Sequence, residues 1–193
     1  MTTLKALVLY WSAGGNTQRA AVALARGLES KGAAVTLLSM SDPAANELDP
    51  EAFHLLCLGS PSYHFGVPAP VRTLIERMGQ SHRALGLPEL GCPPRPHRWG
   101  VVFVTYGGPH TGLDEATPAG DYLAQALRHI GREVRGAWYT VGSYHGDPDQ
   151  PNNLLGWLGD IRGRPNDHDL GVIESNARGL AHVLRHALDT AET

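Results

Sequence analysis

The segment at residues 12–17 reads Ser-Ala-Gly-Gly-Asn-Thr and lies between a short apolar run and a longer amphipathic pattern. The backbone N–H groups of such a loop, together with the positive end of a following helix, can surround an anion. The segment lacks the lysine and the magnesium-binding hydroxyl of a Walker A loop, which argues against a nucleoside triphosphatase. It also does not read G-x-G-x-x-G, so the dinucleotide-binding fingerprint is missing. These residue types therefore favour a phosphate monoester held by neutral donors, and a plain turn with an N-cap is the alternative.

Two further loops carry residues suited to a flat ligand. Residues 59–68 read Gly-Ser-Pro-Ser-Tyr-His-Phe-Gly-Val-Pro and contain three adjacent rings, Tyr63, His64 and Phe65. Exposed aromatic rings are favourable where they cover a flat apolar surface. Residues 105–112 read Thr-Tyr-Gly-Gly-Pro-His-Thr-Gly, and their glycines let the backbone approach a ligand closely. Each loop taken singly is also compatible with an ordinary crossover connection.

The elements that must position these loops alternate between short apolar runs and amphipathic patterns. The apolar runs predict strands at residues 4–11, 34–38, 55–58, 101–106 and 134–141. The helical patterns span residues 17–31, from Pro70 to a stop at Gly79, from an N-cap at Thr117 to Gly131, and from Ile173 to Leu188. Five strands alternating with helices predict an α/β fold with a parallel sheet between helical layers.

Three stretches do not follow the alternation. Residues 42–53 contain at most a short helix, and the Pro-rich residues 81–98 are expected to be irregular. Residues 143–170 are long for a connection, and long ordered loops are usually functional. Neither a repeat nor a linker divides the chain, so residues 1–193 are interpreted as one domain. Ligands of open parallel sheets bind outside the carboxyl ends of the strands, where all three chemically informative loops fall.

Composition excludes several classes of protein. Hydrophobic residues make up 42% of the 193 residues, which is too many for a disordered chain. The net charge of −3 and the absence of a long basic run argue against a nucleic-acid binder. No apolar run approaches the roughly 20 residues that cross a bilayer, so no membrane insertion and a cytoplasmic location are expected. Cys57 and Cys92 form neither a disulfide framework nor a zinc knuckle, and Cys57 reads as a core residue.

Taken together, the three loops resemble those of the flavodoxin-like superfamily, in the expected order. Residues 12–17 match its hydroxyl-x-x-Gly-Asn-Thr phosphate loop, residues 59–68 its Gly-Ser-Pro-x-Tyr loop, and residues 105–112 its Tyr-Gly-rich loop. The resemblance implies a doubly wound five-stranded parallel sheet of order 2-1-3-4-5 and the cofactor FMN. It implies cofactor-binding roles for Ser12, Ala13, Gly14, Gly15, Asn16, Thr17, Pro61, Ser62, Tyr63, His64, Phe65, Gly66, Thr105, Tyr106, Gly107, Gly108, His110 and Gly112.

The chain departs from the simplest flavodoxins in three ways. Gly14 stands where many of them carry a third hydroxyl, which removes a side-chain donor but leaves the backbone N–H groups. The net charge is mild compared with that of strongly acidic flavodoxin carriers. Residues 143–170 have no counterpart in the simplest flavodoxins.

Nine of the ten histidines fall into two groups of interest. His64, His110 and His145 follow the third, fourth and fifth predicted strands, where they are either solvated loop residues or hydrogen-bond and proton donors near a flavin. The second group is interpreted as surface or helix residues: His54, His82, His97, His129, His182 and His186. No HExxH motif or Cys/His pairing is present, so no metal site is predicted.

The favoured function is an FMN-binding redox protein that transfers electrons between a reductase and an acceptor, either a partner protein or a small quinone-like molecule. The alternative is an FMN-dependent NAD(P)H:quinone oxidoreductase, and a flavin-free docking module is a third reading. A phosphatase or esterase ranks last because neither Ser12 nor Ser62 lies in a nucleophile-elbow motif or near an evident base. The residues indicate no particular oligomeric state.

Overall fold

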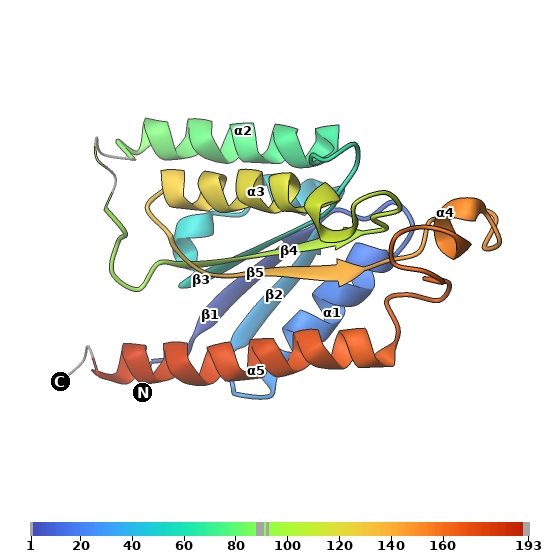
Figure 1. Cartoon of the computed structure of the whole chain (residues 1–193). Coiled ribbons are helices and arrows are strands. Elements are labelled where there is room, and N and C mark those ends of the chain that lie inside the picture. The colour runs from blue at the N-terminus through green and yellow to red at the C-terminus, as the bar shows by residue number, and fades with distance from the viewer. Residues whose placement is uncertain (1, 88–90, 92, 191–193) are drawn as a thin grey trace.

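The computed structural model describes residues 2–87, 91 and 93–190, so Cys92 lies outside the described residues. Its centre is a five-stranded parallel sheet of order β2-β1-β3-β4-β5 (Figure 1). The strands are β1 (Lys5–Tyr10), β2 (Ala34–Ser39), β3 (Leu55–Pro61), β4 (Trp99–Tyr106) and β5 (Glu133–Val141). The predicted α/β class and strand order 2-1-3-4-5 are therefore confirmed.

Helices cover both faces of the sheet. Helices α1 (Asn16–Glu29) and α5 (Asp167–Thr190) pack on one face, and α2 (Ala69–Ala84) and α3 (Thr117–His129) pack on the other (Figure 1). Successive strand residues point to opposite faces, so in β1 Ala6 and Val8 join the core under α1 and α5, whereas Leu7 and Leu9 join the other core. This double burial explains the unbroken apolar runs of the inner strands.

The connections differ from the predictions at a few boundaries. Residues 42–53 contain two 3-10 helices, Pro43–Asn46 and Pro50–Ala52, in agreement with the weak helical pattern. The prediction that Thr117 is the N-cap of α3 is wrong. Ala116 occupies that position, and the Thr117 hydroxyl donates to the Asp114 carbonyl. The irregular segment also begins later than predicted, since residues 81–84 belong to α2.

The stop predicted at Gly79 is wrong, because α2 continues to Ala84. A glycine inside a helix costs about 1 kcal/mol relative to alanine, which tertiary contacts can outweigh. The next helical turn carries His82, whose ring lies 2.8 Å from both the Met78 carbonyl oxygen and the Glu51 carboxylate. His82 is therefore a helix residue but a buried one, and its burial accounts for the extra turn.

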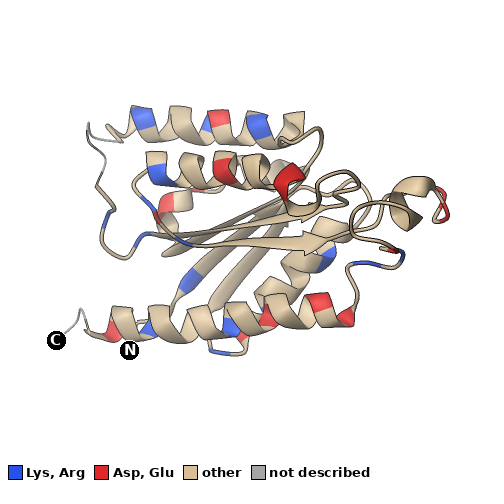
Figure 2. Cartoon of the chain, in the orientation of Figure 1, with Lys and Arg blue, Asp and Glu red and all other residues tan. Residues whose placement is uncertain are grey.

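Four charged side chains and a histidine meet at the amino edge of the sheet in a group that we call the Glu51 cluster: Glu51, His82, Arg95, Arg98 and Arg132. The Arg95 guanidinium donates to both Glu51 carboxylate oxygens at 2.8 Å, and Arg132 Nη2 lies 3.6 Å from Oε1. Basic and acidic segments accordingly lie near one another at this end of the molecule (Figure 2). The cluster ties α2 and the segments before β3, β4 and β5 together.

Burial of Arg132 makes this cluster costly to disrupt. Its side chain is fully buried, and burial lowers the pKa of the guanidinium to about 10 although the Glu51 charge raises it. Nη2 donates to the Pro50 carbonyl at 2.6 Å, and Nη1 donates to the carbonyls of His54 and Trp99 at 3.3 Å. A buried guanidinium of this kind depends on its carboxylate partner for charge compensation.

We expect Gly27→Ala to destabilise the fold by about 1–3 kcal/mol, as overpacking does in other cores. A Cβ at Gly27 in α1 would lie 2.3 Å from the Glu174 carbonyl oxygen of α5 and 2.7 Å from the Ala177 Cβ. Backbone cannot move aside as a flexible side chain can, so the two helices would have to separate. Chemical denaturation measures the change in the free energy of unfolding.

The matched control for Gly27→Ala is Gly179→Ala, at an exposed position of α5 with open space around the site of a Cβ. Alanine there is expected to raise the free energy of unfolding by about 0.5–1 kcal/mol through helix propensity. Equal effects of the two substitutions would contradict the close crossing of α1 and α5.

Candidate functional site

The loop at residues 12–17 joins β1 to α1 at the carboxyl edge of the sheet. The Gly15 N–H donates to Ser12 Oγ at 3.0 Å, which closes the loop and leaves the Ser12 hydroxyl hydrogen available to another acceptor. Gly15 is the N-cap of α1 with φ of 92°, a left-handed conformation that glycine adopts without steric cost. The loop therefore directs the positive end of α1 toward the carboxyl edge.

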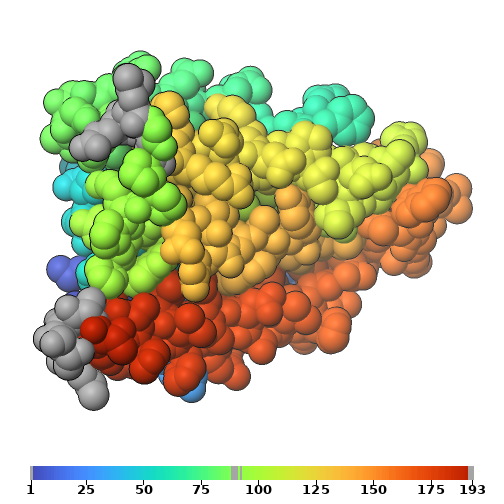
Figure 3. Space-filling view, turned by 60° about the vertical axis from the view of Figure 1, so that its left-hand side comes forward, coloured from blue at the N-terminus to red at the C-terminus, as the bar shows by residue number. Residues whose placement is uncertain are grey.

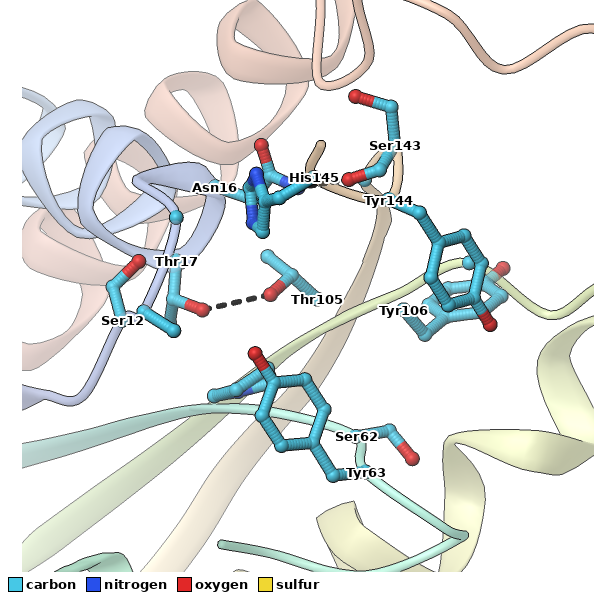
Figure 4. Close-up of a pocket in the computed structure, with 15 residues that line it drawn as sticks. Ser12, Asn16, Thr17, Ser62, Tyr63, Thr105, Tyr106, Ser143, Tyr144 and His145 are labelled. Atoms are coloured by element: carbon cyan, nitrogen blue, oxygen red, sulfur yellow. Dashed lines mark hydrogen bonds between the residues drawn. The ribbon is translucent and has the colours of Figure 1, made fainter. Parts of the chain in front are cut away.

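Two side chains at the start of α1 connect this loop to the opposite strands. Thr17 is buried, and its hydroxyl lies 2.7 Å from the Thr105 hydroxyl at the end of β4 (Figure 4). The Asn16 side-chain amide donates to the Ser143 carbonyl at 2.8 Å. Residues from the ends of β1, β4 and β5 are thus fixed around one space.

That space is a pocket of about 100 Å³, here named the first pocket. Its lining comes from the loops that follow β1, β3, β4 and β5 (Figure 4). The lining residues are Ser12, Ala13, Gly14, Asn16, Thr17, Pro61, Ser62, Tyr63, Thr105, Tyr106, Gly107, Gly142, Ser143, Tyr144 and His145. None of these described residues carries a carboxylate, and hydroxyl, amide, imidazole and backbone groups supply its polar atoms.

A second pocket of about 340 Å³ adjoins the first and shares Ser62, Tyr63, Tyr106, Gly107 and Tyr144 with it. Its remaining lining residues are His64, Phe65, Gly108, Pro109, His110, Glu115 and Asn152. The two pockets adjoin along these shared residues, and the depression that they form is smaller beside residues 12–17 and larger at the end lined by His64 and Phe65, here called the aromatic end.

The aromatic end depends on a strained turn after β3. Tyr63 and Gly66 exchange backbone hydrogen bonds of 2.8 and 3.0 Å, which places His64 and Phe65 at the corner with φ of 48° and 65°. Non-glycine residues in this region cost of order 1 kcal/mol each and cluster at ligand sites. The turn presents Phe65 to solvent with 58% of its surface exposed, whereas Tyr63 packs edge-to-face against Trp11 at 5.9 Å.

Three tyrosines of the depression stay neutral at physiological pH. Burial raises the pKa of each of Tyr63, Tyr106 and Tyr144 above the ordinary value of a tyrosine. The Glu115 charge raises the pKa of Tyr144 further. Arg164 opposes part of the rise for Tyr106. The phenols therefore remain donors and add no negative charge to the pockets.

Residues 143–170 contribute to both pockets rather than lying apart from them. The segment contains the short helix α4 (Pro151–Leu154) and reaches the loop after β4, where the Trp157 N–H donates to the Pro109 carbonyl at 2.8 Å. Figure 3 shows this orange segment next to the residues that follow β4 at one end of the molecule. The Tyr144 ring lies so close to Gly107 that a Cβ there would be 2.1 Å from Cε2.

The structure brings most of the predicted site residues together. Of the eighteen, only Gly15, Gly66 and Gly112 line neither pocket, and these three shape the loops instead. The Ser62 hydroxyl donates to the Glu115 carbonyl at 2.6 Å and so fixes the loop after β3 to the loop after β4. Among the three strand-end histidines, His64 and His110 line the second pocket and His145 lines the first.

Five lining residues lie outside the sequence motifs and were missed: Glu115, Gly142, Ser143, Tyr144 and Asn152. The length of residues 143–170 was the available signal for Ser143, Tyr144 and Asn152. Within the described part of the chain, no group of three or more histidine, cysteine or acidic residues is arranged to hold a metal ion. The described helices also include none with the length and apolar character needed to span a bilayer.

Comparison with solved structures shows a flavodoxin-like fold. A flavodoxin from the domain Archaea superposes with a TM-score of 0.63 at 21% identity, covering 95% of this chain and 100% of its own. The WrbA-like flavodoxin of Agrobacterium tumefaciens gives 0.62 at 18% identity, covering 96% and 99%. The Flv1 flavodiiron core of Synechocystis gives 0.63 at 21% identity, but this chain spans only 37% of it. No family model and no curated protein matches the sequence.

Proposed function

We propose that this chain binds FMN at the carboxyl edge of its sheet and transfers electrons between a reductase and an acceptor. The observation that carries the proposal is this depression, whose carboxylate-free end at the start of α1 suits a phosphate and whose aromatic end suits a flat ring system. When bound, FMN would supply the redox chemistry, and the protein would supply its binding and orientation.

The residues present fit the two ends of FMN. Ser12, Thr17 and the backbone N–H groups at the start of α1 are suited to hold the phosphate, helped by the helix dipole. Tyr63 and Tyr144 line both pockets and are suited to flank the isoalloxazine ring. Gly107 supports this fit, since its missing side chain lets the Tyr144 ring close over the loop after β4.

A two-electron quinone reductase is the second candidate, and one observation favours it. His64 and His110 both line the second pocket, where imidazoles can deliver protons to a substrate beside the flavin. Reduction of a quinone to a hydroquinone takes up two protons together with two electrons, and these groups can supply them. We place the carrier first because the chain contains no nicotinamide-binding fingerprint.

One experiment tests the proposal and separates the two candidates. The purified chain is titrated with FMN, followed by flavin absorbance and fluorescence, and the complex is then reduced stepwise under anaerobic conditions. Two well-separated one-electron steps without NADH or NADPH oxidation would support the carrier. A single two-electron step with rapid quinone-dependent NAD(P)H oxidation would support the reductase. Failure to bind FMN at any concentration up to the millimolar range would refute both and favour a flavin-free docking module.

A further inference from the structure

The imidazole of His145 occupies the place of a side chain at position 14. A Cβ on Gly14 would lie 1.8–2.0 Å from Nε2, Cδ2 and Cε1 of the His145 ring. The φ of Gly14 lies outside the left-handed region, so the backbone itself does not require glycine there. The imidazole instead leaves no room for a side chain at position 14 unless its exposed ring moves aside. Gly14 and His145 therefore form a matched pair, one without a side chain and the other filling the space.

The loop that carries His145 is held in place by a buried amide. Asn153 is fully buried in α4, and its side chain accepts from the Tyr144 N–H at 2.7 Å and donates to the Tyr144 carbonyl at 3.2 Å. Gln150 donates to the His145 carbonyl at 3.0 Å, and the Ser143 N–H donates to the Arg164 carbonyl at 2.9 Å. The backbone on both sides of His145 is thus fixed, while no described residue forms a hydrogen bond with its ring.

Charge in the first pocket favours an anion beside this ring. Among the fifteen described lining residues, His145 is the one able to carry a positive charge, and the ionisable neighbours facing it are the neutral phenols of Tyr63, Tyr106 and Tyr144. The loop at residues 12–17 contains no ionisable side chain. The charges outside the pocket on the surrounding segments are Asp147, Arg162 with its ion-pair partners Asp149 and Asp160, Glu115 after β4, and the Arg164–Asp169 ion pair.

Resting on the proposed function, we propose that His145 binds the phosphate group of FMN in place of a side chain at position 14. Its ring would donate an N–H to the phosphate monoester alongside Ser12 and Thr17, so that a segment after β5 completes the phosphate site. A charge-assisted donor of this kind discriminates between flavins, since riboflavin has no phosphate for it to bind.

The test compares FMN and riboflavin affinities of four proteins: the wild type, His145→Ala, Gly14→Ser and the double variant Gly14→Ser/His145→Ala. We expect His145→Ala to weaken FMN binding about tenfold and to leave riboflavin binding nearly unchanged. Gly14→Ser alone should also weaken FMN binding, because its side chain collides with the ring. In the double variant the serine hydroxyl fits the vacated space, and FMN affinity should recover to within about threefold of wild type.

His182→Ala is the matched control, since His182 is an exposed histidine of α5 outside both pockets. Its two flavin affinities should equal those of the wild type. Equal losses of FMN and riboflavin in His145→Ala, or a double variant as weak as His145→Ala, would overturn the assignment.

A titration without flavin separates failure of this inference from failure of the proposed function. Inorganic phosphate is added to the ligand-free chain while the His145 ring resonances are followed by NMR, with His182 as the internal reference. A saturable shift of the His145 resonances alone supports the assignment even if neither flavin binds. Unchanged or equally shifted resonances of the two histidines would contradict it.

Discussion

Glu51→Gln is expected to lower the free energy of unfolding by about 3 kcal/mol at pH 7, in line with the loss of one partner from a buried ion pair. The carboxylate is only 17% exposed and compensates the fully buried guanidinium of Arg132. Glutamine keeps the size of the side chain but removes its charge. Arg132 would then remain buried without a counter-charge, and Arg95 would lose its bidentate acceptor.

The same carboxylate makes stability depend on pH in a defined direction. Burial would raise the pKa of Glu51, but hydrogen bonds from Arg95 and His82 and the Arg132 charge outweigh it and lower the pKa from 4.5 to about 2. A depressed folded-state pKa gives stability that is complete above pH 4.5 and is lost as the pH falls toward 2. The shift corresponds to about 3 kcal/mol, and Glu51→Gln should lack this part of the acid sensitivity.

Denaturant unfolding measured at pH 7 and at intervals down to pH 2 checks both expectations. The matched control is Glu47→Gln, an exposed carboxylate in the same segment, whose loss should change stability by less than about 0.5 kcal/mol. If Glu51→Gln retained the acid dependence of the wild type, the Glu51 cluster would not be its source.

Thr17→Val is expected to weaken FMN binding about 10- to 150-fold while affecting riboflavin little. Valine has nearly the shape of threonine, so the substitution removes a hydroxyl at the start of α1 without opening space. A hydrogen bond to a charged phosphate contributes about 1.5–3 kcal/mol, which corresponds to this range of affinities. Fluorescence titration with the two flavins measures it.

Thr140→Val provides the control for Thr17→Val, because Thr140 is a buried threonine of β5 that lines neither pocket. It should leave both affinities at wild-type levels. An equal loss of FMN and riboflavin binding in Thr17→Val would mean that the hydroxyl acts through its bond to Thr105 and the packing of the pocket rather than on the phosphate.

The sequence predicted those parts of the fold that local patterns determine. Apolar runs located all five strands, and the resemblance of three loops to those of the flavodoxin-like superfamily implied the sheet order that the structure confirms. The end of α2 was mispredicted because Gly79 is a local stop signal, whereas the turn beyond it is stabilised by the contact of His82 with Glu51. No pattern within a short window contains a contact between residues this far apart in the chain.

The candidate site, too, was predicted only where local motifs mark its residues. The loops after β1, β3 and β4 carry compact motifs, and most of their residues line the pockets. Tyr144 was missed because no motif surrounds it, and its place follows from the Asn153 side chain that fixes its backbone. His145 was noted for its position after the fifth strand, but its pairing with Gly14 depends on how the ends of β1 and β5 meet.

The depression is assembled from four segments that meet only when the sheet is complete, so a ligand that bridges them binds the native state alone. Occupancy and folding are then linked: ligand at 100 times its Kd adds about 2.7 kcal/mol to the free energy of unfolding. This gain is close to the loss expected for Glu51→Gln at the opposite edge of the sheet. The melting temperature of that variant would therefore act as a gauge of site occupancy, rising toward the wild-type value as the ligand is added.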